Sequence, residues 1–377
     1  MIKICSLTPF TTNYSIKLAN SNEQHETDIY NNTEDPYISL SKSYIQMKLL
    51  SYIGQSYIMK MNESDKKMNG LSLDDILLMC SNSSWICDKS NDFEYYFDKM
   101  NGNCYRYNSG RSRNNIIYKI NQPGIENGLQ LQLLIEPADK NENLFSFQNG
   151  YQIFITDQNH EQLFGNGIQV LPGYSTNIIL KKQIETSPPK PHTNCTDNLD
   201  SVDSYYSEFY KRTISSRLNY LEYECKSLCL NKFFQEYCQC SDPKFITYYD
   251  NVSFCLTTDK INCQLRAYKI FLQQDEYSKC DCPKSCKTTS YFYSSSVSEF
   301  PTKSYYYNKL MKNPLILKML NENKSMASYD DIRKMVISVN IFYNELTETW
   351  VTAQIKTDIS SFISNIGGIL GLFLGKI

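Results

Sequence analysis

Cysteine is the residue type whose number and spacing most restrict the chemistry of this chain. Ten of its fourteen cysteines lie within residues 195–286. Thiols at this density form structural disulfides or bind a metal, most often zinc. Structural zinc sites favour C-x2-4-C pairs, whereas the closest pairs here, Cys238 with Cys240 and Cys280 with Cys282, are spaced C-x-C. The spacing therefore favours disulfides, and we expect no metal site.

Two cysteine pairs predict how these thiols are joined. Cys225 and Cys229 are four apart within residues 221–234, which have the pattern of a helix, so both sulfurs lie on one face. Cys280 and Cys282 are two apart beside a proline, which favours an extended strand where the two side chains also share a face. If this strand returns antiparallel to the helix, Cys225 pairs with Cys282 and Cys229 with Cys280.

The other cysteines of this stretch complete a nested set of bonds. We expect Cys195 with Cys286, Cys238 with Cys263, and Cys240 with Cys255. Cysteine count alone leaves the connectivity open, so the prediction depends on the matched spacings.

Asparagine sequons support an extracellular location. Asn-x-Ser/Thr occurs at Asn13, Asn31, Asn62, Asn82, Asn194, Asn251 and Asn323. Together with the cysteines, these predicted glycosylation sites indicate passage through the secretory route.

Composition excludes several classes of protein. With 377 residues, 41% of them hydrophobic, the chain can bury a core in two or more lobes, and its net charge of −2 gives no basic surface for nucleic acid. The three histidines, His25, His160 and His192, lie in separate segments, and the ten cysteines of residues 195–286 are assigned to bonds. No nucleophile and base come together, so we expect neither an enzyme nor a cofactor.

The remaining pattern predicts an α+β fold. Residues 71–79 have the apolar spacing of a short helix capped by Ser72, and residues 311–320 also read as helical. Strands are expected over residues 2–12, 129–134, 151–156, 175–181, 288–293 and 335–346. Three prolines within residues 188–191 mark a lobe boundary before the cysteine-rich stretch.

Both ends of the chain suggest missing membrane segments. Residues 1–5 lack the apolar core of a signal peptide, although the cysteines require an oxidising compartment. Residues 359–377 are apolar, and their four glycines are typical of membrane helices, which use small residues for close packing. We therefore expect a fragment that lacks a first membrane helix and most of a second.

Several motifs in order along the chain resemble the epithelial sodium channel, degenerin and acid-sensing ion channel superfamily. They are residues 4–10 (ICSLTPF), 102–110 (GNCYRYNSG), 171–173 (LPG), the cysteine-rich stretch, 340–346 (NIFYNEL) and 367–375 (GGILGLFLG). The resemblance covers nearly the whole length of the chain.

The resemblance implies a trimer whose ectodomain is built like a hand. It would place a first palm strand in residues 1–18, a finger in 19–101, palm and β-ball strands in 102–190, a disulfide-rich helical thumb in 191–286, palm and knuckle in 287–358, and the start of the second transmembrane helix in 359–377. It also implies bonds from Cys5 to Cys104 and from Cys80 to Cys87.

Pore and gating positions are implied in the same way. They are Ser364, where bulky side chains hold relatives open, Asn365, Gly368, Gly371 and Gly375. The chain departs from the family at Lys376 and Ile377, where relatives carry small residues that select sodium. A lysine there would repel cations, so we expect these two residues to come from a read-through splice site.

Two further departures concern proton sensing. Acid-sensing relatives carry an aspartate at Asn365, and an adjacent acidic pair where residues 158–161 (QNHE) keep one acid. Clustered carboxylates are what raise pKa values toward neutral pH, so proton gating is disfavoured. His160 and His192 are expected to be solvated surface side chains.

The resemblance implies a subunit of an amiloride-sensitive sodium channel at the plasma membrane, gated by an extracellular ligand or by force. Its partners would be related subunits in a homo- or hetero-trimer, sodium ions, lipid, and a peptide or extracellular-matrix ligand. The alternative is a secreted, disulfide-rich binding protein derived from such an ectodomain.

Overall fold

The structure, a computed structural model, describes residues 1–7, 61–68, 70–83, 85–98, 101–135, 148–158, 167–216, 220–322, 328–356 and 359–375. The strands are β1 Ile2–Ser6, β2 Leu77–Asn82, β3 Trp85–Ile86, β4 Phe93–Asp98, β5 Gly102–Tyr107, β6 Leu129–Leu134, β7 Tyr151–Ile155, β8 Ile168–Val170, β9 Tyr174–Thr186, β10 Cys195–Thr196, β11 Lys284–Ser285, β12 Lys287–Glu299 and β13 Val336–Thr352. The α-helices are α3 Glu63–Met68, α4 Leu73–Ile76, α5 Lys89–Asp92, α6 Glu208–Ser216, α7 Glu222–Cys238, α8 Thr258–Gln273, α9 Glu276–Lys279, α10 Lys303–Asn308, α11 Pro314–Glu322, α12 Tyr329–Arg333 and α13 Ile359–Leu374. Short 3₁₀ helices are η2 Ile125–Asn127, η4 Val202–Ser204 and η5 Leu310–Lys312. This mixture agrees with the predicted α+β class.

One hydrophobic core joins the two larger sheets. The five-stranded sheet has the order β4-β5-β1-β7-β8, and the six-stranded sheet has the order β12-β9-β13-β6-β2-β3. Ile4 and Ile153 of the first sheet share a buried cluster with Leu131 and Val339 of the second. β6, β9 and β13 contribute alternate residues to this cluster, as expected when one face of a sheet is buried.

Strand β1 belongs to the five-stranded sheet. β1 lies between β5 and β7 in the five-stranded sheet, with Cys5 opposite Cys104, whereas β13 lies in the six-stranded sheet. Because both edges of β1 are hydrogen-bonded within its own sheet, it cannot also pair with the longer strands.

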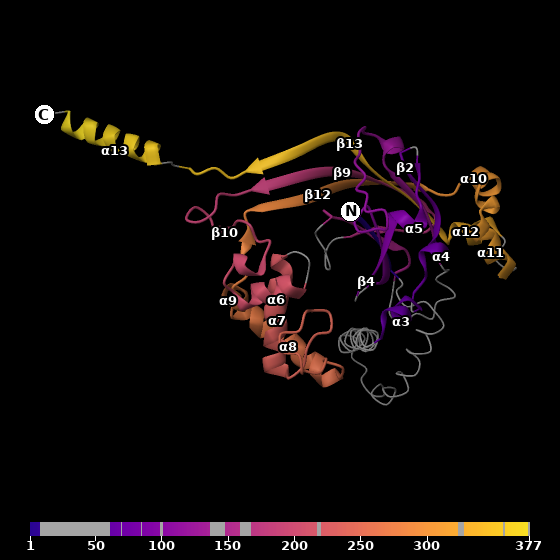
Figure 1. Ribbon diagram of the computed structural model, residues 1–377, viewed down its shortest axis with the longest axis horizontal. Coiled ribbons are helices and arrows are strands. Elements are labelled where there is room, and N and C mark those ends of the chain that lie inside the picture. The colour runs from indigo at the N-terminus through magenta and orange to yellow at the C-terminus, as the bar shows by residue number, and fades with distance from the viewer. Residues whose placement is uncertain are drawn as a thin grey trace, which may run out of the picture.

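Three long strands form a ribbon through the molecule, which we call the central ribbon. Figure 1 shows β12, β9 and β13 running from α10–α12 at one end toward α13 at the other. β12 is antiparallel to β9, and β13 is parallel to it. The register of β13 on β9 shifts between Tyr343 and Glu348, because β13 advances five residues where β9 advances two, from Leu180 to Lys182. This insertion of three extra residues is a β-bulge of the special, larger kind.

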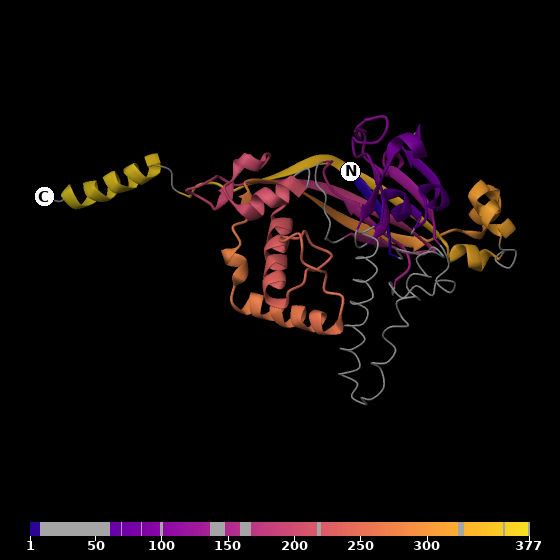
Figure 2. The same cartoon turned by 60° about the horizontal axis from the view of Figure 1, so that its bottom comes forward.

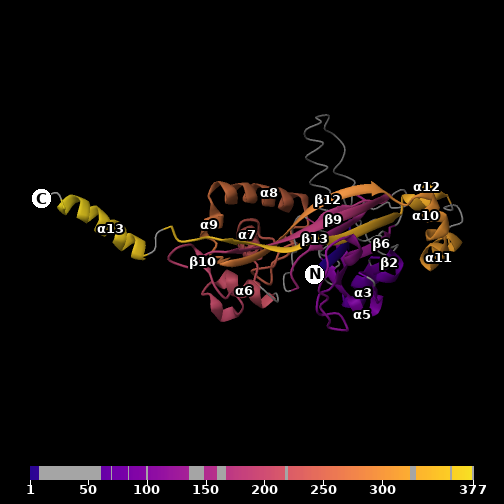
Figure 3. The same cartoon turned by 90° about the horizontal axis from the view of Figure 1, so that it is seen from above.

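Helices cover the two ends of the ribbon. At one end, α10–α12 pack through Tyr306, Ile316 and Ile332 onto Val336 and Leu134 of the six-stranded sheet. At the other end, α6–α9 form a separate helical lobe beside the ribbon, as Figures 2 and 3 show. The part of the predicted finger region before residue 61 lies outside the described residues.

One predicted helix is mostly wrong. Residues 71–79 were expected to be helical, but α4 ends at Ile76, and Leu77 turns into strand β2, opposite Leu133 of β6. A short leucine-rich run suits a helix or a buried strand equally well, and pairing with β6 decided between them. The predicted cap is present, since Ser72 accepts a hydrogen bond from the backbone of Asp75.

The C-terminal helix α13 stands apart from the sheets in Figure 1. Its 16 residues carry exposed apolar side chains such as Phe362 and Leu372. In the part of the chain that the structure describes, no helix reaches the length and apolarity required to cross a bilayer.

Candidate functional site

The helical lobe, residues 195–286, holds five of the seven disulfides. The bonds join Cys195 to Cys286, Cys225 to Cys282, Cys229 to Cys280, Cys238 to Cys263, and Cys240 to Cys255. These are the pairs that the spacing predicted, and we call each bond a rung. The two bonds outside the lobe, Cys5–Cys104 and Cys80–Cys87, are those that the resemblance implied.

Helix α7 directs the rungs to different partners. Cys225 and Cys229 lie one turn apart on it, as the spacing required. The helix ends at Gln239, whose φ of 54° is left-handed. This reversal lets Cys238 face α8 from the helix while Cys240 bonds the loop that precedes α8.

The segment that carries Cys280 and Cys282 does not have the predicted secondary structure. Residues 280–282 were expected to form a strand, but Cys280 ends α9, and the N–H of Cys282 donates to the carbonyl of Cys280 over 2.8 Å. This bond closes a tight turn around Asp281. The turn still presents both sulfurs to α7, so the pairing holds although the strand does not exist.

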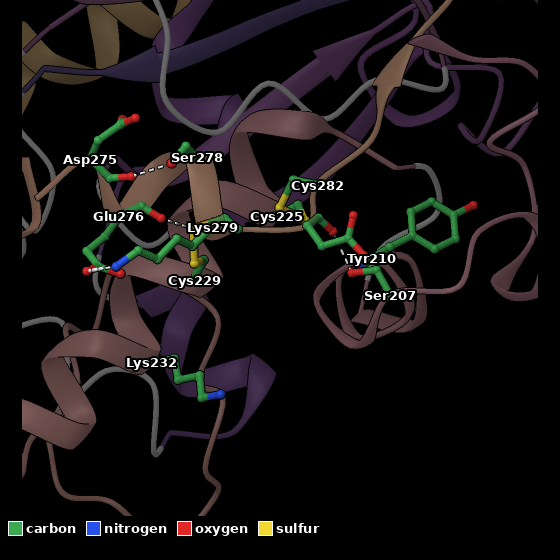
Figure 4. The surroundings of a disulfide bond; sticks show 12 residues. Ser207, Tyr210, Cys225, Cys229, Lys232, Asp275, Glu276, Ser278, Lys279 and Cys282 are labelled. Atoms are coloured by element: carbon green, nitrogen blue, oxygen red, sulfur yellow. Dashed lines mark hydrogen bonds and ion pairs between the residues drawn. A yellow bond between two sulfur atoms is a disulfide. The ribbon is translucent and has the colours of Figure 1, made fainter. Parts of the chain in front are cut away.

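The start of α6 anchors that turn. Ser207 Oγ donates to the carbonyl of Asp281 over 2.5 Å, and the Tyr205 hydroxyl donates to the carboxylate of Asp281 over 2.7 Å. Figure 4 shows Ser207 and Tyr210 beside the Cys225–Cys282 rung. The rungs are therefore fixed by α6 as well as by α7.

Two buried amides on α7 hold the long loop between α7 and α8. Asn231, fully buried, donates to Ser241 Oγ at 2.9 Å and to the Ile246 carbonyl at 2.8 Å, and accepts from the N–H of Asp242 at 2.8 Å. One turn later, Gln235 accepts from the N–H of Tyr248 and Tyr249. The amides replace the backbone partners that a loop otherwise lacks.

We expect Asn231→Ala to lower the free energy of unfolding of the lobe by about 2 kcal/mol, because it strands a buried N–H and a buried carbonyl. Lys226→Ala on the same helix is the control, since it removes only an exposed pair with Glu222 and should cost less than about 0.5 kcal/mol. Urea denaturation of both variants tests this, and equal midpoints would contradict it.

A charged cluster joins α6 to the same loop. The Tyr248 hydroxyl donates to Glu208 Oε2 over 2.5 Å, and Arg212 Nε lies 3.2 Å from Glu208 Oε1. The hydrogen bond from Tyr248, followed by the Arg212 contacts, holds the pKa of Glu208 below its ordinary value of 4.5. Burial, with the Glu208 bond second, raises the pKa of Tyr248 to about 12.

The lowered pKa predicts where acid weakens this contact. A carboxylate whose pKa is lower in the folded protein stabilises the folded state fully at any pH above its ordinary pKa, here 4.5. That stabilisation is lost as the pH falls through the pKa of the folded protein. We therefore expect wild type to lose thermal stability below pH 4.5 with a component that Glu208→Gln lacks. Melting curves from pH 3 to pH 7 measure it, and parallel profiles for the two proteins would refute it.

The helical lobe meets the central ribbon at one joint. The N–H of Ser187, just after β9, donates to the carbonyl of Cys286 over 2.9 Å. Next to it, the N–H of Ala353, just after β13, donates to the carbonyl of Thr186 over 2.9 Å. Two consecutive residues at the end of β9 thus hold two different parts of the chain. Ser187 bonds the helical lobe, and Thr186 bonds the segment that leads to α13.

The predicted pore and gating residues all lie on α13 or at its end. Ser364, Gly368, Gly371 and Gly375 are spaced four, three and four apart, so they share one face of the helix. They are exposed, and a Cβ at Gly368 or Gly371 would meet nothing within 4 Å. Asn365 is exposed beside them. Lys376 and Ile377 lie outside the described residues.

Of the other predicted positions, His192 is exposed in the loop before the lobe, and Gln158 follows β7. His25, His160 and residues 159–161 lie outside the described residues. No cluster of three metal-binding side chains occurs within the described ranges. No sequence pattern indicates the joint at Thr186, because the backbone bonds there depend on strand register and not on side-chain type.

The described sequons differ in accessibility. Asn62, Asn194 and Asn251 are exposed, whereas Asn82 is half-buried at the end of β2. Asn13, Asn31 and Asn323 lie outside the described residues. We expect glycans at the three exposed positions. Single Asn→Gln variants of the secreted or surface protein should each remove one glycosidase-sensitive step in gel mobility, whereas Asn82→Gln should not.

Comparison with known proteins identifies the family to which the chain belongs. The sequence profile of the amiloride-sensitive sodium channel family matches residues 1–376. The chain belongs to this family. It is 24% identical over 327 residues to epithelial sodium channel subunit gamma-2 of Xenopus laevis, which covers 84% of this chain and 45% of the relative.

Two further relatives match most of the chain at similar identity. The degenerin-like protein asic-2 of Caenorhabditis elegans is 24% identical over 318 residues, covering 80% of this chain and 55% of the relative. The FMRFamide-activated amiloride-sensitive sodium channel of Cornu aspersum is 24% identical over 395 residues, covering 82% and 60%. The chain spans about half the length of the curated relatives it matches.

Proposed function

We propose that this chain is the extracellular portion, with adjoining pore-helix residues, of one subunit of a trimeric amiloride-sensitive sodium channel. The channel conducts sodium passively across the plasma membrane, and an extracellular ligand or force gates it. Membership of an ion-channel family supports this class of function over an enzyme.

The observation that carries the proposal is the joint at Thr186. A lobe braced by five rungs can move only as a rigid body, because each bond restricts local unfolding. Its connection through Ser187 lies one residue from the bond between Thr186 and Ala353. Displacement of the lobe therefore shifts the segment that leads to α13, as in rigid-body switching.

The proposed pore face follows from α13. Glycines on one face allow neighbouring helices to approach closely, and Ser364, Gly368, Gly371 and Gly375 supply such a face. In the proposal, this face lines the permeation path for sodium, and the exposed Phe362 and Leu372 contribute to contacts with lipid or other helices.

The test is expression of the full-length transcript in oocytes with recording of amiloride-sensitive sodium current under peptides, stretch and acid. Ala353→Pro removes the N–H that bonds Thr186, and Ala353→Gly keeps it. We expect current from wild type and from the glycine variant, with the response lost in the proline variant at equal surface expression. Secretion of the protein without any current would favour the binding-protein alternative.

A further inference from the structure

Tyr206 is the most exposed tyrosine in the described part of the chain, at 93%. It lies between η4 and α6, outside any helix or strand. The N–H of Ser207 donates to the carbonyl of Tyr205 over 3.2 Å, which closes a tight turn with Tyr206 at its apex. The phenol therefore projects from the helical lobe into solvent, where the active-site cleft of another protein can reach it.

The hydroxyl of Tyr206 is not used by the fold. Its neighbours are held in place, since the Tyr205 hydroxyl donates to Asp281 Oδ1 over 2.7 Å and the buried Tyr210 donates to a backbone carbonyl over 2.7 Å. To the residues that the structure describes, the Tyr206 hydroxyl makes no hydrogen bond, and its ring has Lys211 Nζ at 5.0 Å from the centroid. The oxygen is therefore available to react.

The sequence around Tyr206 is acidic. Residues 197–208 carry four carboxylates and no lysine or arginine. All four are exposed, namely Asp197, Asp200, Asp203 and Glu208. A local surplus of negative charge attracts enzymes whose clefts are cationic. Between Cys195 and Cys225 there is also no cysteine and no glycosylation sequon, so neither a disulfide nor a glycan is attached beside Tyr206.

Other exposed tyrosines lack this combination. Tyr223, 51% exposed, has acidic neighbours but lies within α7, two residues before Cys225. Tyr249 is in a loop, but its hydroxyl donates to Glu236 Oε1 over 2.9 Å. Tyr307, 64% exposed on α10, has no acidic residue within residues 300–321, which carry four lysines. It is thus a matched control for exposure without acidic neighbours.

We propose that Tyr206 is a site of tyrosine O-sulfation. The donor class is a nucleotide whose phosphate is joined to sulfate in a mixed anhydride. The phenolic oxygen forms a bond to sulfur, the bond from sulfur to the nucleotide phosphate oxygen breaks, and the phenolic proton passes to a base of the transferase. Because this donor is strongly anionic, the cleft that binds it is cationic and attracts Asp200 and Asp203.

The product carries a permanent negative charge on the helical lobe, next to the start of α6. Lys211, whose ammonium already lies against the ring, can pair with the sulfate. The inference rests on one part of the proposed function, export of the lobe to the cell surface, because a chain meets such transferases in the secretory route. It does not depend on channel activity.

The experiment expresses the full-length protein in secretory cells supplied with radioactive sulfate. N-glycans are removed enzymatically, so that sulfate on sugars is not counted, and tyrosine sulfate is measured after alkaline hydrolysis. We expect it in wild type and in Tyr307→Phe, its near-complete loss in Tyr206→Phe, and several-fold less in the double variant Asp200→Asn with Asp203→Asn. All of these positions are exposed, so the substitutions should leave folding intact.

Glycosylation of the same protein separates the possible failures, because N-glycans show passage through the secretory route. Glycosylated protein without tyrosine sulfate, equal amounts in wild type and Tyr206→Phe, or a group on Tyr206 that a phosphatase removes would each overturn the inference alone. Protein with neither glycan nor sulfate would overturn both the inference and the surface location. Sulfated protein without sodium current would uphold the inference and count against the channel function instead.

Discussion

Replacing the four cysteines of the two central rungs, Cys225 with Cys282 and Cys229 with Cys280, by alanine should lower the stability of the helical lobe by about 6 kcal/mol. Removing either rung alone should cost only about 2 kcal/mol, because the remaining rung closes nearly the same loop. The two bonds span 57 and 51 residues, so their joint loss frees a long segment in the unfolded state.

Hydrogen exchange of α7 amides in native buffer measures this effect. In wild type they should exchange only through opening of the whole lobe, and in the double-rung variant their protection should fall to that of a fraying helix. The control is removal of the Cys80–Cys87 bond, which closes seven residues elsewhere and should leave α7 unchanged. Wild-type protection of α7 after loss of both rungs would show that packing, and not the bonds, holds the lobe.

Gly150→Ala is expected to destabilise the five-stranded sheet by about 3 kcal/mol or more. Gly150 precedes β7 with a φ of 142°, and an added Cβ would overlap the carbonyl oxygen of Val170 on β8. Its own carbonyl accepts the N–H of Leu7 over 2.9 Å. The backbone on both sides is therefore fixed by strand pairing and cannot move away.

Gly124→Ala measures the backbone strain of a positive φ without steric overlap of the added Cβ. Gly124 has a φ of 100°, but a Cβ there would meet nothing within 4 Å. It should therefore cost only the backbone strain, about 1 kcal/mol. Thermal unfolding of the two variants compares them, and a smaller loss for Gly150→Ala than for Gly124→Ala would mean that β8 yields to the new methyl group.

The sequence predicted the bonding of the lobe better than its secondary structure. A four-residue spacing on α7 and a two-residue spacing in residues 280–282 both place two sulfurs on one side. Any local geometry that keeps this property gives the same pairs, whether strand or turn. The turn itself depends on Ser207 and Tyr205 bonding Asp281, which are 74 and 76 residues distant.

Strand ends were predicted less well than strand centres. β12 was expected over residues 288–293 but continues to Glu299. The expectation stopped short because residues 294–299 are mostly serine, with Val297 as their one apolar residue. Pairing with β9 supplies the stability that its composition does not. Similarly, Asn231 and Gln235 look like ordinary polar helix positions, and only the fold of the loop between α7 and α8 gives them their partners.

The β-bulge between Tyr343 and Glu348 fixes the direction in which the last part of β13 faces. Five residues on β13 match two on β9, which reverses the side on which even-numbered residues of β13 lie. Asn340 lies beside Asn177 on the face away from the core, whereas Trp350 lies beside the buried Ile184 on the other face. Loss of a single residue from the bulge would move every following side chain, as far as Thr352, to the opposite face of the sheet. It would also rotate the chain by half a turn where it leaves β13 toward α13. Insertions or deletions in this strand therefore keep the side-chain orientation only when they add or remove an even number of residues. Point substitutions would not reveal this constraint.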